Sequence, residues 1–233
     1  MLRYRIAKII FKIIQAAIST LTVTGKENIP ANGPYIVVVN HMSSADTPIL
    51  LLVFPLTKWR FFAGEKWQAH RLFGPLMQYL GAIYINRGDV DRRALKQALD
   101  MIKSGVVFGL APEGTRSKDG TMQPAKDGAA FLASRSNVPI IPVGLVNSNV
   151  LFGNVRSWKR TQMEAHVGAP FRLPNLGRRV RSRDLAAYTH LIMVQIAAQL
   201  PARYHGVYAD SPALHALLQD DDPWPHCLAL LKE

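Results

Sequence analysis

A histidine and an aspartate form the first pair of residues that could do chemistry. His41 and Asp46 lie five positions apart in the segment 40–46 (NHMSSAD), directly after an apolar run. On a regular helix this spacing places two side chains about 140° apart, so a turn between a strand and a helix would have to bring them together. Asp46 could then accept a hydrogen bond from one imidazole nitrogen, leaving the other to take a proton from a hydroxyl. Helix capping by Asp46 alone explains the same spacing.

The segment 113–116 (EGTR) is the second candidate, and it also follows an apolar run. Arg116 can present its planar guanidinium to a phosphate, and Gly114 lets the backbone approach a ligand closely. Glu113 could fix the arginine side chain or bind a substrate hydroxyl. The alternative is a surface turn with an exposed ion pair, which contributes little to stability.

Two further segments accompany these candidates. The segment 81–88 (GAIYINRG) places Arg87 directly after a predicted strand over 82–86, so we expect Arg87 to point from the same sheet edge. The segment 138–143 (VPIIPV) has the pattern of a strand but contains two prolines, which belong at sheet edges or strand starts. We expect this strand to shape one wall of a pocket.

These four segments need a scaffold, and the chain supplies one by alternating short apolar runs with helical patterns. The apolar runs are bounded by turn residues, which predicts strands. The helical patterns begin at capping residues or stop at glycine or proline. Strands separated by helices predict an α/β fold with a central, mostly parallel sheet flanked by helices. The predicted strands are 35–40, 82–86, 106–111, 139–146 and 162–167, and the predicted helices are 46–54, 91–104, 128–135 and 185–200.

The N-terminal segment has the pattern of a basic amphipathic helix. At about 100° per residue, Arg5, Lys8 and Lys12 fall on one narrow face, and apolar residues between Leu2 and Leu21 cover the other. Such a helix lies in a membrane interface with its cations on the polar side. The alternative is a helix packed on the core of its own domain. No apolar run reaches the roughly 18 residues needed to cross a bilayer.

The composition narrows the class of partner. The chain has 233 residues, 48% of them hydrophobic, and a net charge of +12. This charge attracts polyanions, which include nucleic acids, anionic membranes and phosphorylated small molecules. Nucleic acid is disfavoured, because the aromatic residues form no stacking motif among the basic ones. We expect no metal site, because Cys227 is the only cysteine and the histidines lack metal-binding spacing with carboxylates.

Together and in this order, the blocks NHMSSADTP, INRG, PEGTRS and VPIIPV resemble the four successive motifs of the 1-acylglycerol-3-phosphate acyltransferase family, also called PlsC-like lysophospholipid acyltransferases. The resemblance runs from about Val23 to Gly168, and the first and third blocks are the specific ones. Two departures stand out. Ala111 stands where the family usually has a bulky aromatic residue, and Asn86 stands where an aspartate is frequent.

The resemblance implies a reaction and assigns roles to residues. A fatty acyl group would pass from an acyl-CoA or acyl carrier protein thioester, without a metal or other cofactor, to the free hydroxyl of a lysophosphatidic acid-like acceptor in phospholipid biosynthesis. His41 would be the general base and Asp46 its partner. The residues that would bind the phosphate and glycerol of the acceptor are Arg87, Glu113, Gly114, Thr115 and Arg116.

The resemblance also implies a location on the cytoplasmic face of the cell membrane. We therefore expect a membrane-interface helix over residues 1–24, an acyltransferase domain over 25–210 and a C-terminal tail outside the core over 211–233. The tail is expected because the composition changes from about Ser211, with three consecutive aspartates at 220–222 and with Pro223 and Pro225 on either side of Trp224.

Two alternatives stay open at this point. An enzyme of the same fold that acts on another lysolipid or on an acylated amino acid would carry the same four blocks. Outside enzymes, the alternative is a basic membrane-binding protein without catalytic activity. The intact His41–Asp46 pair argues against the second alternative.

Overall fold

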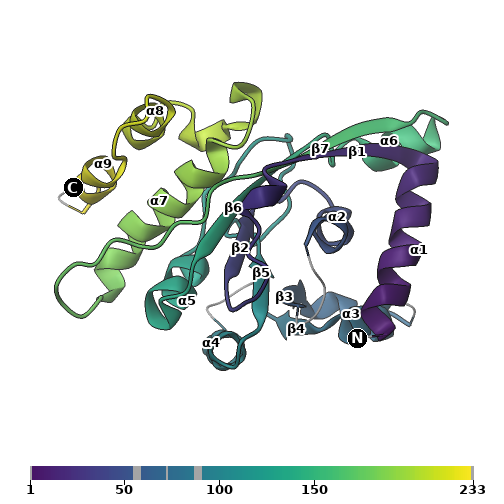
Figure 1. Cartoon of the computed structure of the whole chain (residues 1–233), viewed down its shortest axis with the longest axis horizontal. Coiled ribbons are helices and arrows are strands. Elements are labelled where there is room, and N and C mark those ends of the chain that lie inside the picture. The colour runs from purple at the N-terminus through teal and green to yellow at the C-terminus, as the bar shows by residue number, and fades with distance from the viewer. Residues whose placement is uncertain (1, 55–58, 72, 87–90, 232–233) are drawn as a thin grey trace.

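The computed structural model describes residues 2–54, 59–71, 73–86 and 91–231, and this part of the chain is built on one seven-stranded sheet (Figure 1). The strand order is β1-β7-β6-β2-β5-β3-β4, and all neighbours are parallel except β6 and β7. This confirms the predicted α/β fold with a mostly parallel sheet. The strands are β1 (Ser19–Thr24), β2 (Ile36–Val39), β3 (Trp59–Gly64), β4 (Ala82–Ile85), β5 (Val107–Leu110), β6 (Ile140–Val146) and β7 (Thr161–Val167).

Helices cover both faces of the sheet, as Figure 1 shows. On one face lie α4 (Arg92–Lys103), α5 (Gly128–Ser136), α7 (Leu185–Ala197), α8 (Pro212–Leu218) and α9 (Trp224–Ala229). On the other lie α1 (Leu2–Ile18), α2 (Asp46–Val53), α3 (Phe73–Leu80) and α6 (Leu151–Arg156). The central strand β2 serves both cores, because successive side chains of a strand point to opposite faces. Ile36 and Val38 enter the first core, and Val37 and Val39 enter the second.

In the described residues, six of the strands and α-helices were not predicted from the sequence: β1, β3, α3, α6, α8 and α9. The strand β1 also shortens the N-terminal helix, which ends at Ile18 rather than Leu21. Residues 19–24 (STLTVT) alternate polar and apolar side chains and are rich in β-branched threonine, so they favour a strand, and they pair with β7 at the edge of the sheet. The last six residues of the predicted membrane segment therefore belong to the sheet.

The C-terminal segment differs from the expected tail. The helices α8 and α9 pack against α7, and the side chains of Leu214 and Cys227 are fully buried in the first core. Tyr188 of α7 stacks on Trp224 of α9 with ring centroids 5.2 Å apart. The helix α8 begins with the hydroxyl of Ser211 accepting a hydrogen bond from the N–H of Leu214. The three aspartates and Pro223 thus lie in the connection between two packed helices, and Pro225 lies in the first turn of α9.

None of the helices in the described ranges combines the length and the apolar character that crossing a bilayer requires.

Candidate active site

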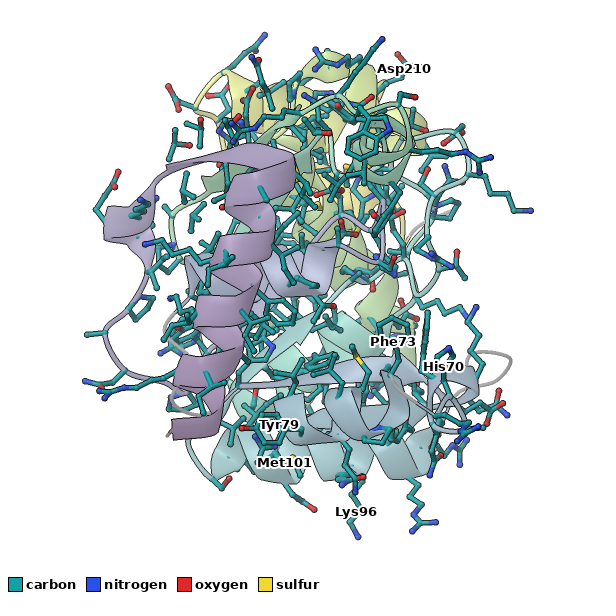
Figure 2. The ribbon with its side chains drawn as sticks, turned by 90° about the vertical axis from the view of Figure 1, so that its right-hand side faces the viewer. His70, Phe73, Tyr79, Lys96, Met101 and Asp210 are labelled. Atoms are coloured by element: carbon teal, nitrogen blue, oxygen red, sulfur yellow. The ribbon has the colours of Figure 1, made fainter. Side chains whose placement is uncertain are left out.

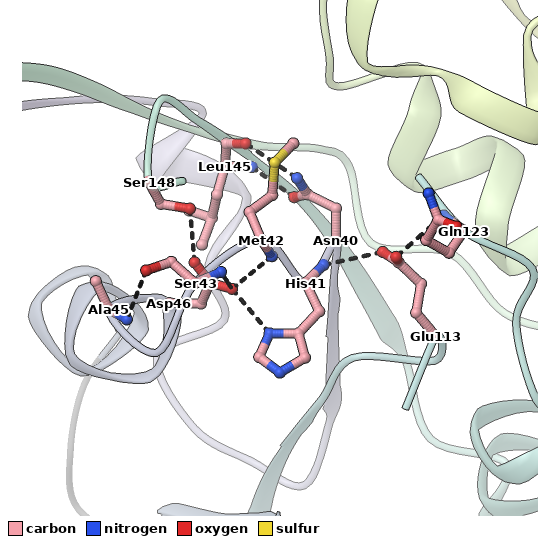
Figure 3. Close-up of polar contacts among 10 residues, drawn as sticks. All are labelled: Asn40, His41, Met42, Ser43, Ala45, Asp46, Glu113, Gln123, Leu145 and Ser148. Atoms are coloured by element: carbon pink, nitrogen blue, oxygen red, sulfur yellow. Dashed lines mark hydrogen bonds and ion pairs between the residues drawn. The ribbon is translucent and has the colours of Figure 1, made fainter. Parts of the chain in front are cut away.

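His41 in the loop after β2 contacts Asp46, the first residue of α2, as the strand-to-helix turn predicted (Figure 3). The Nδ1 atom of His41 lies 2.9 Å from Oδ2 of Asp46. Asp46 is 2% exposed, so its carboxylate sits in the protein interior. Because Nδ1 faces the carboxylate, Nε2 is the ring nitrogen left for a proton transfer.

Asp46 does not cap its helix. Its Oδ2 atom accepts hydrogen bonds from the backbone N–H groups of Met42 and Ser43, both at 2.9 Å, which precede α2. Its Oδ1 atom accepts one from the hydroxyl of Ser148 at 2.7 Å. The carboxylate therefore faces back toward the His41 loop, and capping does not explain the spacing. Ser148 follows β6 and is fully buried; no local signal in the sequence links it to a residue 102 positions away.

Asn40 fixes the point at which the loop leaves the sheet. Its side-chain amide donates to the carbonyl of Leu145 at 3.0 Å and accepts from the N–H of Leu145 at 2.8 Å. The side chain thereby continues the ladder between β2 and β6 beyond the last paired residue of β2, Val39. The sequence reading placed Asn40 in the motif but gave it no role.

Glu113 holds the main chain of the site. It is 3% exposed, and its two carboxylate oxygens accept hydrogen bonds from the N–H groups of His41 at 2.9 Å and Gln123 at 3.0 Å. Burial raises the pKa of this carboxyl from its ordinary value to about 7, although both hydrogen bonds act in the opposite direction. The sequence reading expected Glu113 among the residues that bind the acceptor. The structure instead directs its carboxylate to the backbone.

The rest of the EGTR segment lies beside His41. Gly114 adopts a left-handed conformation with φ of 71°, which closes a turn onto the carbonyl of Ala111. The N–H of Ser117 donates to the carbonyl of His41 at 2.8 Å, so the first and third motifs are joined through the backbone. Thr115 and Arg116 are exposed. Arg87 lies outside the described residues.

Two cavities open onto His41. The larger has a volume of about 410 Å³ and a mostly apolar lining from α1, α2, α3 and β3, and Arg116 stands in its wall. The smaller has a volume of about 140 Å³ and lies against β5, where Ala111, Asn86 and Lys126 line it. Trp59 also lines it, and the Trp59 ring lies so close to Gly109 that a Cβ atom on residue 109 would approach the ring to 2.3 Å. A histidine, an arginine and hydrocarbon-sized apolar space thus share one site.

The described residues contain no group of three or more His, Cys, Asp or Glu side chains arranged to hold a metal ion. We therefore assign no metal ligand among them.

The chain is similar to known acyltransferases in sequence and in fold. A family model described as Acyltransferase matches residues 20–146, more than half of the chain. A 1-acyl-sn-glycerol-3-phosphate acyltransferase of Brassica napus is 31% identical over 54% of this chain and 37% of its own length. One from Homo sapiens is 33% identical over 52% of this chain and 44% of its own. One from Bacillus subtilis is 21% identical over 83% and 94%.

A solved structure described as the 1-acyl-sn-glycerophosphate acyltransferase PlsC of Thermotoga maritima superposes with a TM-score of 0.64. It is 27% identical, and the superposition covers 80% of this chain and 74% of that one. The matches to the Brassica and human relatives span about half of this chain and less than half of theirs. The chain belongs to the acyltransferase family.

Proposed function

We propose that the protein transfers a fatty acyl group from an acyl thioester to the free hydroxyl of a 1-acylglycerol 3-phosphate acceptor, in phospholipid biosynthesis. The observation that carries this proposal is the larger cavity. It brings His41, which Asp46 orients, together with Arg116 and a long apolar wall. A lysophosphatidic acid needs these three features, because it has a hydroxyl to activate, a phosphate to bind and a hydrocarbon chain to bury. Relatives named 1-acyl-sn-glycerol-3-phosphate acyltransferase support the same proposal.

His41 acts as the general base. Its Nε2 atom takes the proton of the acceptor hydroxyl while the oxygen attacks the thioester carbonyl carbon. A carbon–oxygen bond forms and the carbon–sulfur bond breaks, and the departing thiolate takes the proton from the imidazolium. Asp46 stabilises that imidazolium and keeps Nε2 as the reactive nitrogen, as its bond to Nδ1 at 2.9 Å requires.

Arg116 binds the acceptor phosphate. Its exposed guanidinium stands in the wall of the cavity that contains His41 and can make two parallel hydrogen bonds to phosphate oxygens. Thr115 and the backbone at Gly114 adjoin Arg116 in the chain and contribute to the acceptor site. The family resemblance assigns Arg87 to the same acceptor, although this residue lies outside the described ranges. Glu113 stabilises this site by accepting a hydrogen bond from the backbone N–H of His41.

The donor is an acyl thioester of CoA or of acyl carrier protein. Cleavage of the thioester itself supplies the energy for transfer without a further cofactor. The acceptor is a lipid, so we place the enzyme at the cytoplasmic face of a membrane, where these donors are present. The helix α1 supports this location, because it carries basic residues and also lines the cavity through Phe11, Ile14 and Ile18.

A mass-spectrometric assay of acyl transfer tests the proposal. The purified full-length chain is given lysophosphatidic acid, lysophosphatidylcholine, monoacylglycerol and an N-acyl amino acid, each with acyl-CoA and with acyl carrier protein. We expect lysophosphatidic acid to be acylated fastest, because it alone offers a terminal phosphate to Arg116. Equal rates with monoacylglycerol would contradict phosphate recognition, and preference for another acceptor would reassign the substrate within the family.

A further inference from the structure

Large apolar side chains that stay exposed gather on one part of the described molecule. Five lie on α1, two on α3 and four in the segment 150–158, whereas three lie elsewhere. Soluble monomers rarely expose a large contiguous apolar patch without a partner. The eleven are Ile6, Ile9, Ile10, Ile13, Ile14, Phe73, Tyr79, Val150, Phe152, Val155 and Trp158.

Trp158 is the most exposed of these residues, at 98%. It follows α6 in a left-handed conformation with φ of 56°, which glycine or asparagine usually adopts after a helix and which strains a bulky residue. The turn is well bonded, since the N–H of Trp158 donates to Val155 at 3.1 Å and that of Lys159 to Asn154 at 2.8 Å. The backbone thus holds an indole ring outside the protein, where the fold itself gains nothing from it.

The segment 150–160 lies beside the C-terminal end of α1 (Figure 1). Arg160 joins them, because its Nη2 atom donates to the carbonyls of Ala16 at 2.7 Å and Ser19 at 3.1 Å. Phe152 and Ile14, both about half exposed, also line the larger cavity with His41. The exposed apolar patch is therefore continuous with the wall of the active site.

The charge of both segments suits an anionic surface. Residues 2–18 contain four cations, residues 150–160 contain three, and neither segment has an aspartate or glutamate. The five exposed isoleucines of α1 form a stripe about 140° wide, and Arg5 and Lys12 lie along one edge of it. Figure 2 looks onto this side of the molecule and shows α1 in front of the rest of the ribbon, with Phe73 also on the viewer's side. Apolar stripes bordered by cations are typical of helices that lie in a lipid interface.

We propose that residues 150–160 form a second bilayer-contact surface, which acts together with α1 and places the Trp158 ring among the head groups of an anionic leaflet. The inference rests on the proposed function, since it names the surface from which the acceptor comes. Tryptophan beside arginine and lysine is the composition of a membrane interface. Because Phe152 and Ile14 belong to both the patch and the cavity, an acceptor can move from the leaflet toward His41 along apolar side chains.

Sedimentation with vesicles tests this surface. Trp158→Ser in the full chain should weaken binding to phosphatidylcholine vesicles that contain phosphatidylglycerol by about tenfold, because the ring's apolar area stays in water. Leu218→Ser is the matched control, since Leu218 is 55% exposed but lies on α8 across the sheet, and it should bind as the wild type does. Equal binding by Trp158→Ser and the wild type would overturn the proposal.

Fluorescence locates the ring itself. Lipids brominated on the acyl chain should quench the wild type more than Trp158→Phe, which keeps an apolar side chain but lacks the indole. Identical quenching of the two proteins would place Trp158 outside the bilayer. Concentration-dependent self-association that Trp158→Ser abolishes, without a change in vesicle binding, would show that the patch binds a second copy of the chain and would likewise overturn the proposal.

Turnover of detergent-dispersed lysophosphatidic acid separates this inference from the proposed function. It should be unchanged in Trp158→Ser, because the substitution leaves His41 and Arg116 in place. A loss of that turnover equal to the loss on vesicles would mean that the residue supports the fold, not the lipid contact. If the wild type binds vesicles through Trp158 but acylates no lysolipid, the proposed function fails and the surface stands.

Discussion

The two faces of the sheet share the same strands but treat apolar surface in opposite ways. On the face of α4, α5 and α7, the apolar side chains are closed into a core, and α8 and α9 add a further layer over α7. On the face of α1, α2 and α3, a cavity of about 410 Å³ reaches His41, and the isoleucines of α1 remain exposed. The first face stabilises the fold, whereas the second leaves apolar surface uncovered where a lipid substrate would use it.

The helix α7 shows why the first face needs its extra layer. Nine of its residues are buried, distributed around the helix rather than along one stripe. A helix that is apolar all round must be covered on more than one side. The sheet covers one side, and α8 and α9 cover another. By contrast, Ala7 is the one buried apolar residue among residues 5–18 of α1, whose side chains the structure describes, so this part of α1 contributes little to the core.

The largest effect on stability should come from the face covered by α4, α5, α7, α8 and α9, here called the packed face. Leu214→Ala removes a fully buried side chain of α8 and should lower the free energy of unfolding by about 2–5 kcal/mol, through lost burial and a residual cavity. The activity of the folded protein should not change, because α8 lies across the sheet from His41. Denaturant unfolding and acyl-transfer rates measure the two quantities. Leu218→Ala, on the same helix but 55% exposed, should stay within about 0.5 kcal/mol of the wild type.

Glu113 is buried, as the residues of the packed face are, but its side chain is ionisable. Its pKa is about 7 in the folded protein and near 4.5 in the unfolded chain, so the folded state binds the proton more tightly. The contribution of this carboxyl to the free energy of unfolding is therefore complete below pH 4.5. It decreases by roughly 3 kcal/mol as the pH rises through 7.

Glu113→Gln removes this titration. The stability of the wild type relative to the variant should therefore decrease by roughly 3 kcal/mol between pH 4.5 and pH 7, as measured by denaturant unfolding across that range. Glu27→Gln, an exposed position, is the control and should show no such change. A difference between wild type and Glu113→Gln that stays constant with pH would contradict the raised pKa.

On the face of α1, α2 and α3, here called the open face, a substitution should reduce activity without reducing stability. This is the reverse of the result expected for Leu214→Ala. His41→Ala should lower acyl transfer by at least about 100-fold, as removal of a general base does. Its denaturation midpoint should change little, because Asp46 keeps the bonds from Met42, Ser43 and Ser148. His166→Ala, whose histidine bonds Thr24 and Glu164 on another part of the sheet, should retain activity. Near-normal turnover in His41→Ala would remove this residue from the mechanism.

The sequence predicted the elements that follow local patterns and the contact of His41 with Asp46, but not α8 and α9, which lie in the segment it predicted as a tail outside the core. Apolar runs and helix stops gave β2, β5, β6, α4 and α7, and the strand-to-helix turn gave the contact of His41 with Asp46. It did not predict contacts between distant positions. Ser148 meets Asp46 across 102 residues, and Glu113 meets the backbone of His41 across 72. Whether a carboxylate faces a cavity or a backbone N–H is decided by burial, which the motif alone does not contain.

Arg116→Lys gives the smallest expected effect and tests the rim of the open face. The variant keeps the charge but replaces a planar, two-point donor by a single ammonium, so one hydrogen bond to the acceptor phosphate is lost. A loss of about 1.4 kcal/mol corresponds to a tenfold higher KM for lysophosphatidic acid. If the phosphate is held equally in the ground state and the transition state, kcat should not change.

Monoacylglycerol, which has no phosphate, should react equally with variant and wild type. Arg92→Lys, exposed on α4 over the packed face, should leave both constants unchanged. An unaltered KM for lysophosphatidic acid in Arg116→Lys would show that this guanidinium does not contact the phosphate, and would shift the search for the phosphate ligand to Lys126, which lines the smaller cavity beside Gly114.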